Sequence, residues 1–199
     1  WTKPVFSPGR VNLSEVICSL NDFLPDDAII ANGAGNYTAW VHRFYRYRTL
    51  GSQLAPTAGS MGYGLPAAVA AKLVQPHRPA IVFAGDGCFM MTGQELATAV
   101  QYQLSVVIVV VNNGMFGTIR MHQERRFPGR VIGTELVNPD FCALAQAYGA
   151  HAERVEETAA FLPTLRRALD ISGPALIELI VDPEAITPAR TLSDLKAGG

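Results

Sequence analysis

The stretch that decides the fold reads Ala80-Ile81-Val82-Phe83-Ala84, followed at once by Gly85-Asp86-Gly87-Cys88. A second stretch, residues 106–111, reads Val-Val-Ile-Val-Val-Val and stops at Asn112-Asn113-Gly114. Both runs are apolar at every position, which is typical of strands buried on both faces of a parallel sheet. Because glycine, aspartate and asparagine favour turns, each strand is predicted to end where these residues begin.

Helical and strand patterns alternate along the rest of the chain. Helices are predicted over residues 13–23, 61–74, 92–103, 139–148 and 156–170. Two further short strands are predicted at 28–31 and 175–181. Strands that alternate with helices predict an α/β fold with a doubly wound, mostly parallel sheet and helices on both faces. Such sheets bind ligands at the carboxyl ends of their strands, so the turns after the strands are the expected place of a site.

Length and composition favour one globular domain. The chain has 199 residues, of which 49% are hydrophobic and 17% charged, with a net charge of -1. We predict one domain over residues 1–184 and a C-terminal tail over 185–199, since a single core can grow to about 250–300 residues. The near-neutral charge argues against nucleic acid or an acidic membrane surface as partner. The longest apolar run, 106–111, is too short to cross a bilayer.

The cysteines and the first residues of the chain indicate its cellular compartment. Cys18, Cys88 and Cys142 are scattered and form no CxxC pair, so we expect no disulfides and a reducing, cytoplasmic location. The chain begins at Trp1 without an apolar signal core, so no secretion signal is expected. The missing initiator methionine leaves open that the chain is a fragment of a longer protein.

The turns after the two strands contain oxygen ligands of the kind that magnesium prefers. Asp86 offers a carboxylate, Asn113 an amide oxygen, and the chain near Met115 a backbone carbonyl. Only 24 residues separate Gly87 from Asn112, enough for one helix and one strand, so both turns are expected at the same edge of the sheet. The flanking glycines let the backbone approach a phosphate, and the following helix would point free N–H groups at it. Either turn alone is ordinary; the pair indicates a magnesium and phosphate site.

These residues also resemble a known signature. Gly85-Asp86-Gly87 followed by Asn112-Asn113 is similar to the thiamine diphosphate (ThDP) signature, which runs from GDG to NN. Residues 59–68, Gly-Ser-Met-Gly-Tyr-Gly-Leu-Pro-Ala-Ala, resemble the segment of acetolactate-synthase-type enzymes that cradles the middle of the cofactor. Residues 92–96 and 112–117 are also typical of that superfamily. The resemblance covers roughly residues 5–190, and it is specific to the cofactor rather than to the substrate.

The resemblance implies a set of residues that hold the cofactor and its Mg²⁺. Asp86, Asn113 and the carbonyl of Met115 correspond to the family's metal ligands. Met61 corresponds to an apolar wedge between the two cofactor rings, and the carbonyl of Gly59 would accept a hydrogen bond from the pyrimidine amino group. The other residues expected to bind the cofactor, among them the backbone N–H groups that bind its diphosphate, are Gly35, Asn36, Ser60, Gly85, Gly87, Cys88, Phe116 and Gly117.

The resemblance further implies an enzyme. Its members are ThDP-dependent lyases or transferases that act on 2-keto acids, by acetolactate synthase-like carboligation or by decarboxylation. They carry a pyrimidine-binding domain, whose glutamate activates the cofactor, and they form homo-oligomers such as dimers or tetramers. That domain is not found in the 199 residues, so we expect no activating glutamate here and an inactive chain without its partner domain or subunit.

Some alternatives stay open. His122 is a candidate acid or base, or equally a solvated helix histidine. Acetolactate synthases usually carry a tryptophan where this chain has Met121-His122, so another keto-acid decarboxylase or carboligase fits as well. A nucleotide-binding oxidoreductase domain is disfavoured, because Thr38 replaces the last glycine of a GxGxxG pattern and no Walker lysine is found. A non-catalytic regulatory module that keeps the fold is the third reading.

Overall fold

The computed structural model describes residues 3–197, to which every structural statement below refers. Its sheet has six strands, all parallel, in the order β2-β1-β3-β4-β6-β5. The strands are β1 (Ile29–Asn32), β2 (Gln53–Leu54), β3 (Ala80–Gly85), β4 (Val106–Asn112), β5 (His151–Val155) and β6 (Ala175–Ile180). The predicted α/β fold with a parallel sheet is therefore confirmed.

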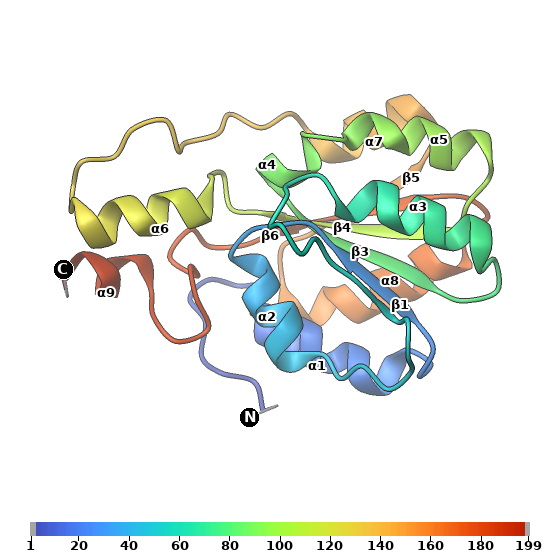
Figure 1. Cartoon of the computed structure of the whole chain (residues 1–199), viewed down its shortest axis with the longest axis horizontal. Helices are drawn as coiled ribbons and strands as arrows, with labels where there is room; N and C mark the ends of the chain where they lie inside the picture. The colour runs from blue at the N-terminus through green and yellow to red at the C-terminus, as the bar shows by residue number, and fades with distance from the viewer. Residues whose placement is uncertain (1–2, 198–199) are drawn as a thin grey trace.

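Helices cover both faces of the sheet (Figure 1). One face carries α1 (Leu13–Phe23), α2 (Tyr37–Phe44) and α8 (Thr158–Asp170), and the other carries α3 (Gly64–Val74), α5 (Leu96–Gln101) and α7 (Phe141–Tyr148). Short helical turns, α4 (Asp86–Phe89) and η1 (Gly93–Glu95), follow β3. Beside the sheet, α6 (Gly117–Arg126) and α9 (Leu192–Ala197) pack on each other, at the left of Figure 1. Among the described helices, none is long and apolar enough to span a membrane.

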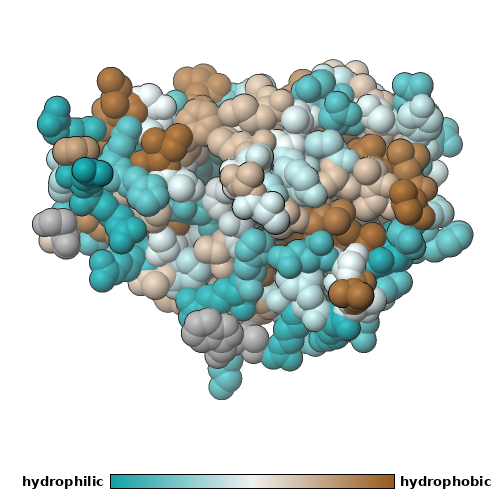
Figure 2. Space-filling view, in the orientation of Figure 1, coloured by the Kyte–Doolittle hydropathy of each residue, from teal (hydrophilic) through white to brown (hydrophobic). Residues whose placement is uncertain are grey.

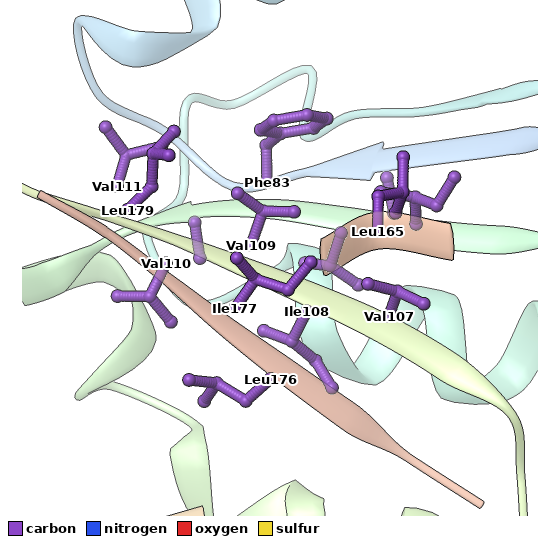
Figure 3. Packing of buried hydrophobic residues seen from close by; sticks show 14 of the residues in the cluster. Phe83, Val107, Ile108, Val109, Val110, Val111, Leu165, Leu176, Ile177 and Leu179 are labelled. Carbon is purple, nitrogen blue, oxygen red and sulfur yellow. The ribbon is translucent and has the colours of Figure 1, made fainter. Parts of the chain in front are cut away.

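The central strand β4 supplies both halves of the core. Successive side chains of a strand point to opposite faces. Figure 3 shows Val109 beside Phe83 on one side of the sheet and Ile108 with Val110 on the other. Residues 106–111 are each no more than 5% exposed. An unbroken run of β-branched residues therefore serves two buried faces at once, which is why the sequence pattern predicted this strand.

Some predicted elements are shorter in the structure, and others were not predicted at all. The helix predicted over 61–74 begins only at Gly64, because Gly62 has a positive φ of 81°. Such a value lies in the left-handed region that helices avoid. The helix predicted over 92–103 is a 3-10 turn followed by the short α5. The helix α2 and the edge strands β2 and β5 were not predicted from the sequence.

The segment predicted as a tail contains a helix. Residues 192–197 form α9, whose two leucines are buried with Ile186 and Met115 in a second apolar cluster. Met121 of α6 packs against this cluster. The sequence gives little sign of it, since the helix is short and its partners lie far away along the chain. Gly198 and Gly199 lie outside the described residues.

Replacing Ile108 by alanine is expected to lower the free energy of unfolding by about 2–5 kcal/mol, since it leaves a cavity in a close-packed core. Ile108 is 0% exposed, whereas Ile132 is 79% exposed and serves as the matched control. Ile132→Ala should change the same free energy by less than about 0.5 kcal/mol. Urea denaturation followed by circular dichroism measures both values. Equal losses in the two variants would contradict the description of the core.

Candidate functional site

A cavity of about 220 Å³ opens at the carboxyl edge of the sheet. Its walls come from the chain that follows β1, β3, β4 and β6 and from the segment before α3. From β1 the chain goes to β2 on one side, and from β3 it goes to β4 on the other. The cavity therefore lies at the point where the strand order reverses, which is the expected place of a ligand site in a doubly wound sheet.

The structure brings together all but one of the residues predicted to bind the cofactor. Those that line the cavity are Gly35, Asn36, Gly59, Met61, Gly85, Asp86, Gly87, Cys88, Asn113, Met115, Phe116 and Gly117. Ser60 is exposed and does not line the cavity, and neither does His122, which is exposed on α6. Tyr37, Trp40 and Thr118 also line it and were not predicted from the sequence.

Asp86 is a buried carboxylate at the end of β3, only 2% exposed. Its Oδ1 accepts a hydrogen bond from the N–H of Gly87 (2.9 Å), and its Oδ2 accepts from the N–H of Gly114 and from Nδ2 of Asn138, each at 2.8 Å. Burial raises the pKa of Asp86, and these hydrogen bonds oppose that rise. None of the ion pairs found between residues 3 and 197 involves Asp86. A buried carboxylate without a counter-charge is unfavourable, so the site favours a cation.

The turn after β4 brings two more oxygen groups to the same place. Gly114, with a φ of 69°, turns the chain so that its N–H reaches Asp86. Met115 forms an antiparallel bridge with Glu135 that uses the backbone groups of the two residues flanking Met115. The carbonyl of Met115 therefore faces away from Glu135. Asn113 lines the cavity beside it, with Oδ1 3.3 Å from the N–H of Met115.

Cys88 joins three of the loops around the cavity. Its Sγ accepts hydrogen bonds from the N–H of Gly62 (3.2 Å) and from the hydroxyl of Tyr37 (3.4 Å). A Cβ on Gly33 would lie 2.3 Å from the same sulfur, so only glycine allows this close approach after β1. Burial raises the pKa of Tyr37 well above its usual value, which keeps its hydroxyl a donor. The buried thiol thus sets the spacing between the loops.

Asn36 connects the loop after β1 to α6 and to the C-terminal segment. Its Nδ2 donates to the carbonyl of Ile186 (2.9 Å), and its Oδ1 accepts from the hydroxyl of Thr118 (2.8 Å). A Cβ on Gly117 would lie 3.1 Å from the side chain of Ile186. The segment around Ile186, predicted as part of a tail, therefore supports one wall of the cavity.

Glu124 holds together the elements next to this wall of the cavity. Its side chain is 1% exposed, with Oε1 2.9 Å from Nε of Arg120 and 3.7 Å from Nζ of Lys196 on α9. Its Oε2 accepts a hydrogen bond from the N–H of Gly129 at 2.9 Å. The hydrogen bond from Gly129, followed by Arg120 and Lys196, holds the pKa of Glu124 below its usual value. One carboxylate thus joins α6, the loop after it and α9.

The fold and the cavity define a doubly wound α/β domain with a ligand site at the switch point of its sheet. A narrower assignment comes from comparison with known families. The family described as "Thiamine pyrophosphate enzyme, C-terminal TPP binding domain" matches residues 33–179. The chain belongs to this family, whose cofactor, thiamine pyrophosphate, is the thiamine diphosphate named above. The resemblance seen in the sequence is thereby confirmed.

Acetolactate synthases are among the relatives of this chain. It is 36% identical over 154 residues to the mitochondrial acetolactate synthase catalytic subunit of Aspergillus candidus. The aligned residues cover 77% of this chain and 22% of that protein. It is 35% identical over 170 residues to the acetolactate synthase large subunit of Lactococcus lactis, covering 84% of this chain and 29% of that protein. The mitochondrial acetolactate synthase of Schizosaccharomyces pombe is 36% identical over 181 residues, which cover 88% of this chain and 27% of that protein. The chain spans less than a third of each relative.

Lowering the pH is expected to weaken the packing of α9 against α6. Because the pKa of Glu124 is lowered in the folded chain, its stabilising contribution is present above the unfolded pKa of about 4.3 and is lost as the pH falls through the folded pKa. We therefore expect amide protection factors in α9 to drop below a pH of about 4. Glu124→Gln should lower them already at neutral pH, whereas Glu156→Gln, at an exposed position, should not. Hydrogen exchange read by mass spectrometry measures this, and full protection in Glu124→Gln would contradict the role of Glu124.

Proposed function

We propose that this chain binds thiamine diphosphate through Mg²⁺, with the carboxylate of Asp86, the amide oxygen of Asn113 and the carbonyl of Met115 as the protein's metal ligands. The observation that carries the proposal is the buried Asp86, which lines the cavity without an ion-pair partner among the described residues. Mg²⁺ prefers oxygen ligands and commonly combines one or two carboxylates with phosphate oxygens and water. The groups present fit that ion.

The turn after β3 suits a diphosphate group. Cys88 lies in the first turn of α4, whose N–H groups have no partner within the helix, so its N–H is open to an anion. The N–H of Gly87 already donates to Asp86. A Cβ at Gly87 would lie 2.4 Å from the ring of Phe116, so packing alone requires glycine there. We therefore assign the diphosphate to the N–H of Cys88, with Gly87 shaping the turn.

Met61 and Gly59 are proposed to hold the middle of the cofactor. Both line the cavity, and Met61 packs against the main core, which fixes its side chain. Met61 would contact the bound cofactor between its two rings, and the carbonyl of Gly59 would accept a hydrogen bond from its pyrimidine amino group. When bound, the cofactor supplies the electron sink for bond cleavage or formation beside a keto group.

The reaction we propose is that of a lyase or transferase acting on a 2-keto acid, by decarboxylation or by acetolactate synthase-like carboligation. Support comes from the family and from the names of the relatives. The activating glutamate is proposed to come from a pyrimidine-binding domain or subunit in a dimer or tetramer, and His122 is kept as a candidate acid or base. A cytoplasmic location is part of the proposal and rests on Cys18, Cys88 and Cys142, none of which forms a disulfide within residues 3–197.

Calorimetric titration of thiamine diphosphate into this chain tests the cofactor assignment. We expect binding that depends on magnesium and is weakened by EDTA. Asp86→Ala should weaken the magnesium-dependent binding by more than about 100-fold, since it removes a metal ligand rather than an outer partner. Asp22→Ala, at an exposed position on α1, is the control and should bind like the unchanged chain.

The same titration distinguishes the alternatives. If the unchanged chain gives no heat of binding, even with a pyrimidine-binding domain supplied, the proposal is contradicted and the non-catalytic module is favoured. Heat with a nicotinamide or flavin nucleotide in place of thiamine diphosphate would favour the oxidoreductase domain. Binding of thiamine diphosphate justifies a screen of 2-keto acids with the pyrimidine-binding domain present.

A further inference from the structure

A row of polar side chains crosses the sheet from β5 to β3, next to the candidate metal site. It consists of Arg154 on β5, Glu178 on β6, Asn112 on β4 and Asp86 after β3, with Asn138 from the loop before α7. The register pairs Arg154 with Glu178. Glu178 is only 2% exposed and interrupts an otherwise apolar strand. Burying a carboxylate in an apolar strand is unfavourable unless it is paired, so packing alone does not explain why Glu178 is there.

Each link in this row is a hydrogen bond. Nε of Arg154 donates to Oε2 of Glu178 at 2.7 Å, and Nδ2 of Asn112 donates to Oε1 of Glu178 at 2.8 Å. Oδ1 of Asn112 accepts from Nδ2 of Asn138 at 3.0 Å and from the N–H of Gly114 at 3.1 Å. Those two donors are the same groups that bind Oδ2 of Asp86. The row therefore ends on the proposed metal ligand.

The carboxylate of Glu178 determines which way the amides point. A carboxylate only accepts hydrogen bonds, so the amino group of Asn112 must face Glu178 and its oxygen must face Asn138. The amino group of Asn138 is then shared between the oxygens of Asn112 and Asp86. If Asn112 were flipped, two amino groups would face each other and Asn138 would lose one of its acceptors. Glu178 therefore determines which group donates and which accepts in each hydrogen bond between it and Asp86.

Two simpler readings explain less. A buried ion pair kept for stability alone is weak, because an apolar residue of similar volume often serves as well or better. Asp140, Cys142 and Glu178 lie close enough together to hold a metal ion. The guanidinium of Arg154 already pairs with Glu178 (2.7 Å) and Asp140 (3.3 Å), however, so their negative charge is compensated.

We propose that Glu178, held by Arg154, is a positioning residue that orients the Asp86 carboxylate for the metal through Asn112 and Asn138. The consequence for metal binding rests on the proposed function. Outer partners that orient metal ligands are typically worth about 10- to 100-fold in metal affinity. The same range is expected here, because every step between Glu178 and Asp86 is a direct hydrogen bond.

Glu178→Gln tests the orientation itself. Glutamine keeps the volume but cannot accept from both Arg154 and Asn112, so the side-chain amide signals of Asn112 and Asn138 should shift in NMR spectra. The matched control is Glu153→Gln, which breaks an ion pair with Arg167 and has no hydrogen bond to the row. Unmoved amide signals in Glu178→Gln overturn the proposal, whether or not the chain binds a cofactor.

Thiamine diphosphate titration of the same variants measures the consequence. Glu178→Gln should weaken the magnesium-dependent binding by about 10- to 100-fold and leave binding in EDTA unchanged. An equal loss with and without magnesium would indicate general destabilisation and overturn the proposal. If the unchanged chain shows no magnesium-dependent binding, the proposed function fails, and the NMR result decides the positioning role alone.

Arg154 provides a second route if Glu178→Gln does not fold. Its side chain is 41% exposed, so Arg154→Met is tolerated more easily than a change at the buried Glu178. Arg154→Met should shift the same amide signals and weaken the magnesium-dependent binding. Arg154→Lys, which keeps the charge beside Glu178, should restore most of both. Equal effects of methionine and lysine, or no effect of either, would overturn the proposal.

Discussion

The burial of the Asp86 carboxylate at the end of β3 constrains the whole carboxyl edge of the sheet. Backbone and amide donors satisfy its oxygens, but they bring no full positive charge. The turn after β4 needs a glycine at position 114 to aim its N–H at this carboxylate, and Asn138 must be held from the other side. The open side faces the cavity. The loops are arranged around a buried carboxylate that none of the ion pairs between residues 3 and 197 neutralises.

The rest of the site follows from ties between loops. Cys88 sets the distance between the loops after β1 and β3 and the segment before α3, and Asn36 ties the first of these loops to the chain near Ile186. Glu124 then holds α9 against α6. On the face shown in Figure 2, hydrophobic side chains gather in separate patches between polar ones. The cavity at the sheet edge is lined by glycines together with large side chains such as Trp40, Met61 and Phe116. Folding of the C-terminal segment and the shape of the cavity are therefore coupled.

The sequence predicted what depends on local pattern. The apolar runs of β3 and β4 and the turn residues after them were sufficient for the parallel sheet and for the position of the site. The edge strands were missed because β5 is only partly buried and contains charged residues, and because β2 has two residues. The helix α2 was predictable, since Tyr37, Trp40, Val41 and Phe44 have helical spacing. Asn138 and Ile186 could not be predicted, because their contacts arise only when distant parts of the chain meet.

The most direct test of the proposed site is the position of the metal itself. Crystals of this chain grown with thiamine diphosphate and Mn²⁺ in place of Mg²⁺ allow the ion to be located by its anomalous scattering. The proposed site predicts one strong peak in contact with the Asp86 carboxylate, Oδ1 of Asn113 and the carbonyl of Met115, at about 2.0–2.2 Å from each. A peak bound to other residues, or a cofactor held in the cavity without a metal at Asp86, would contradict it.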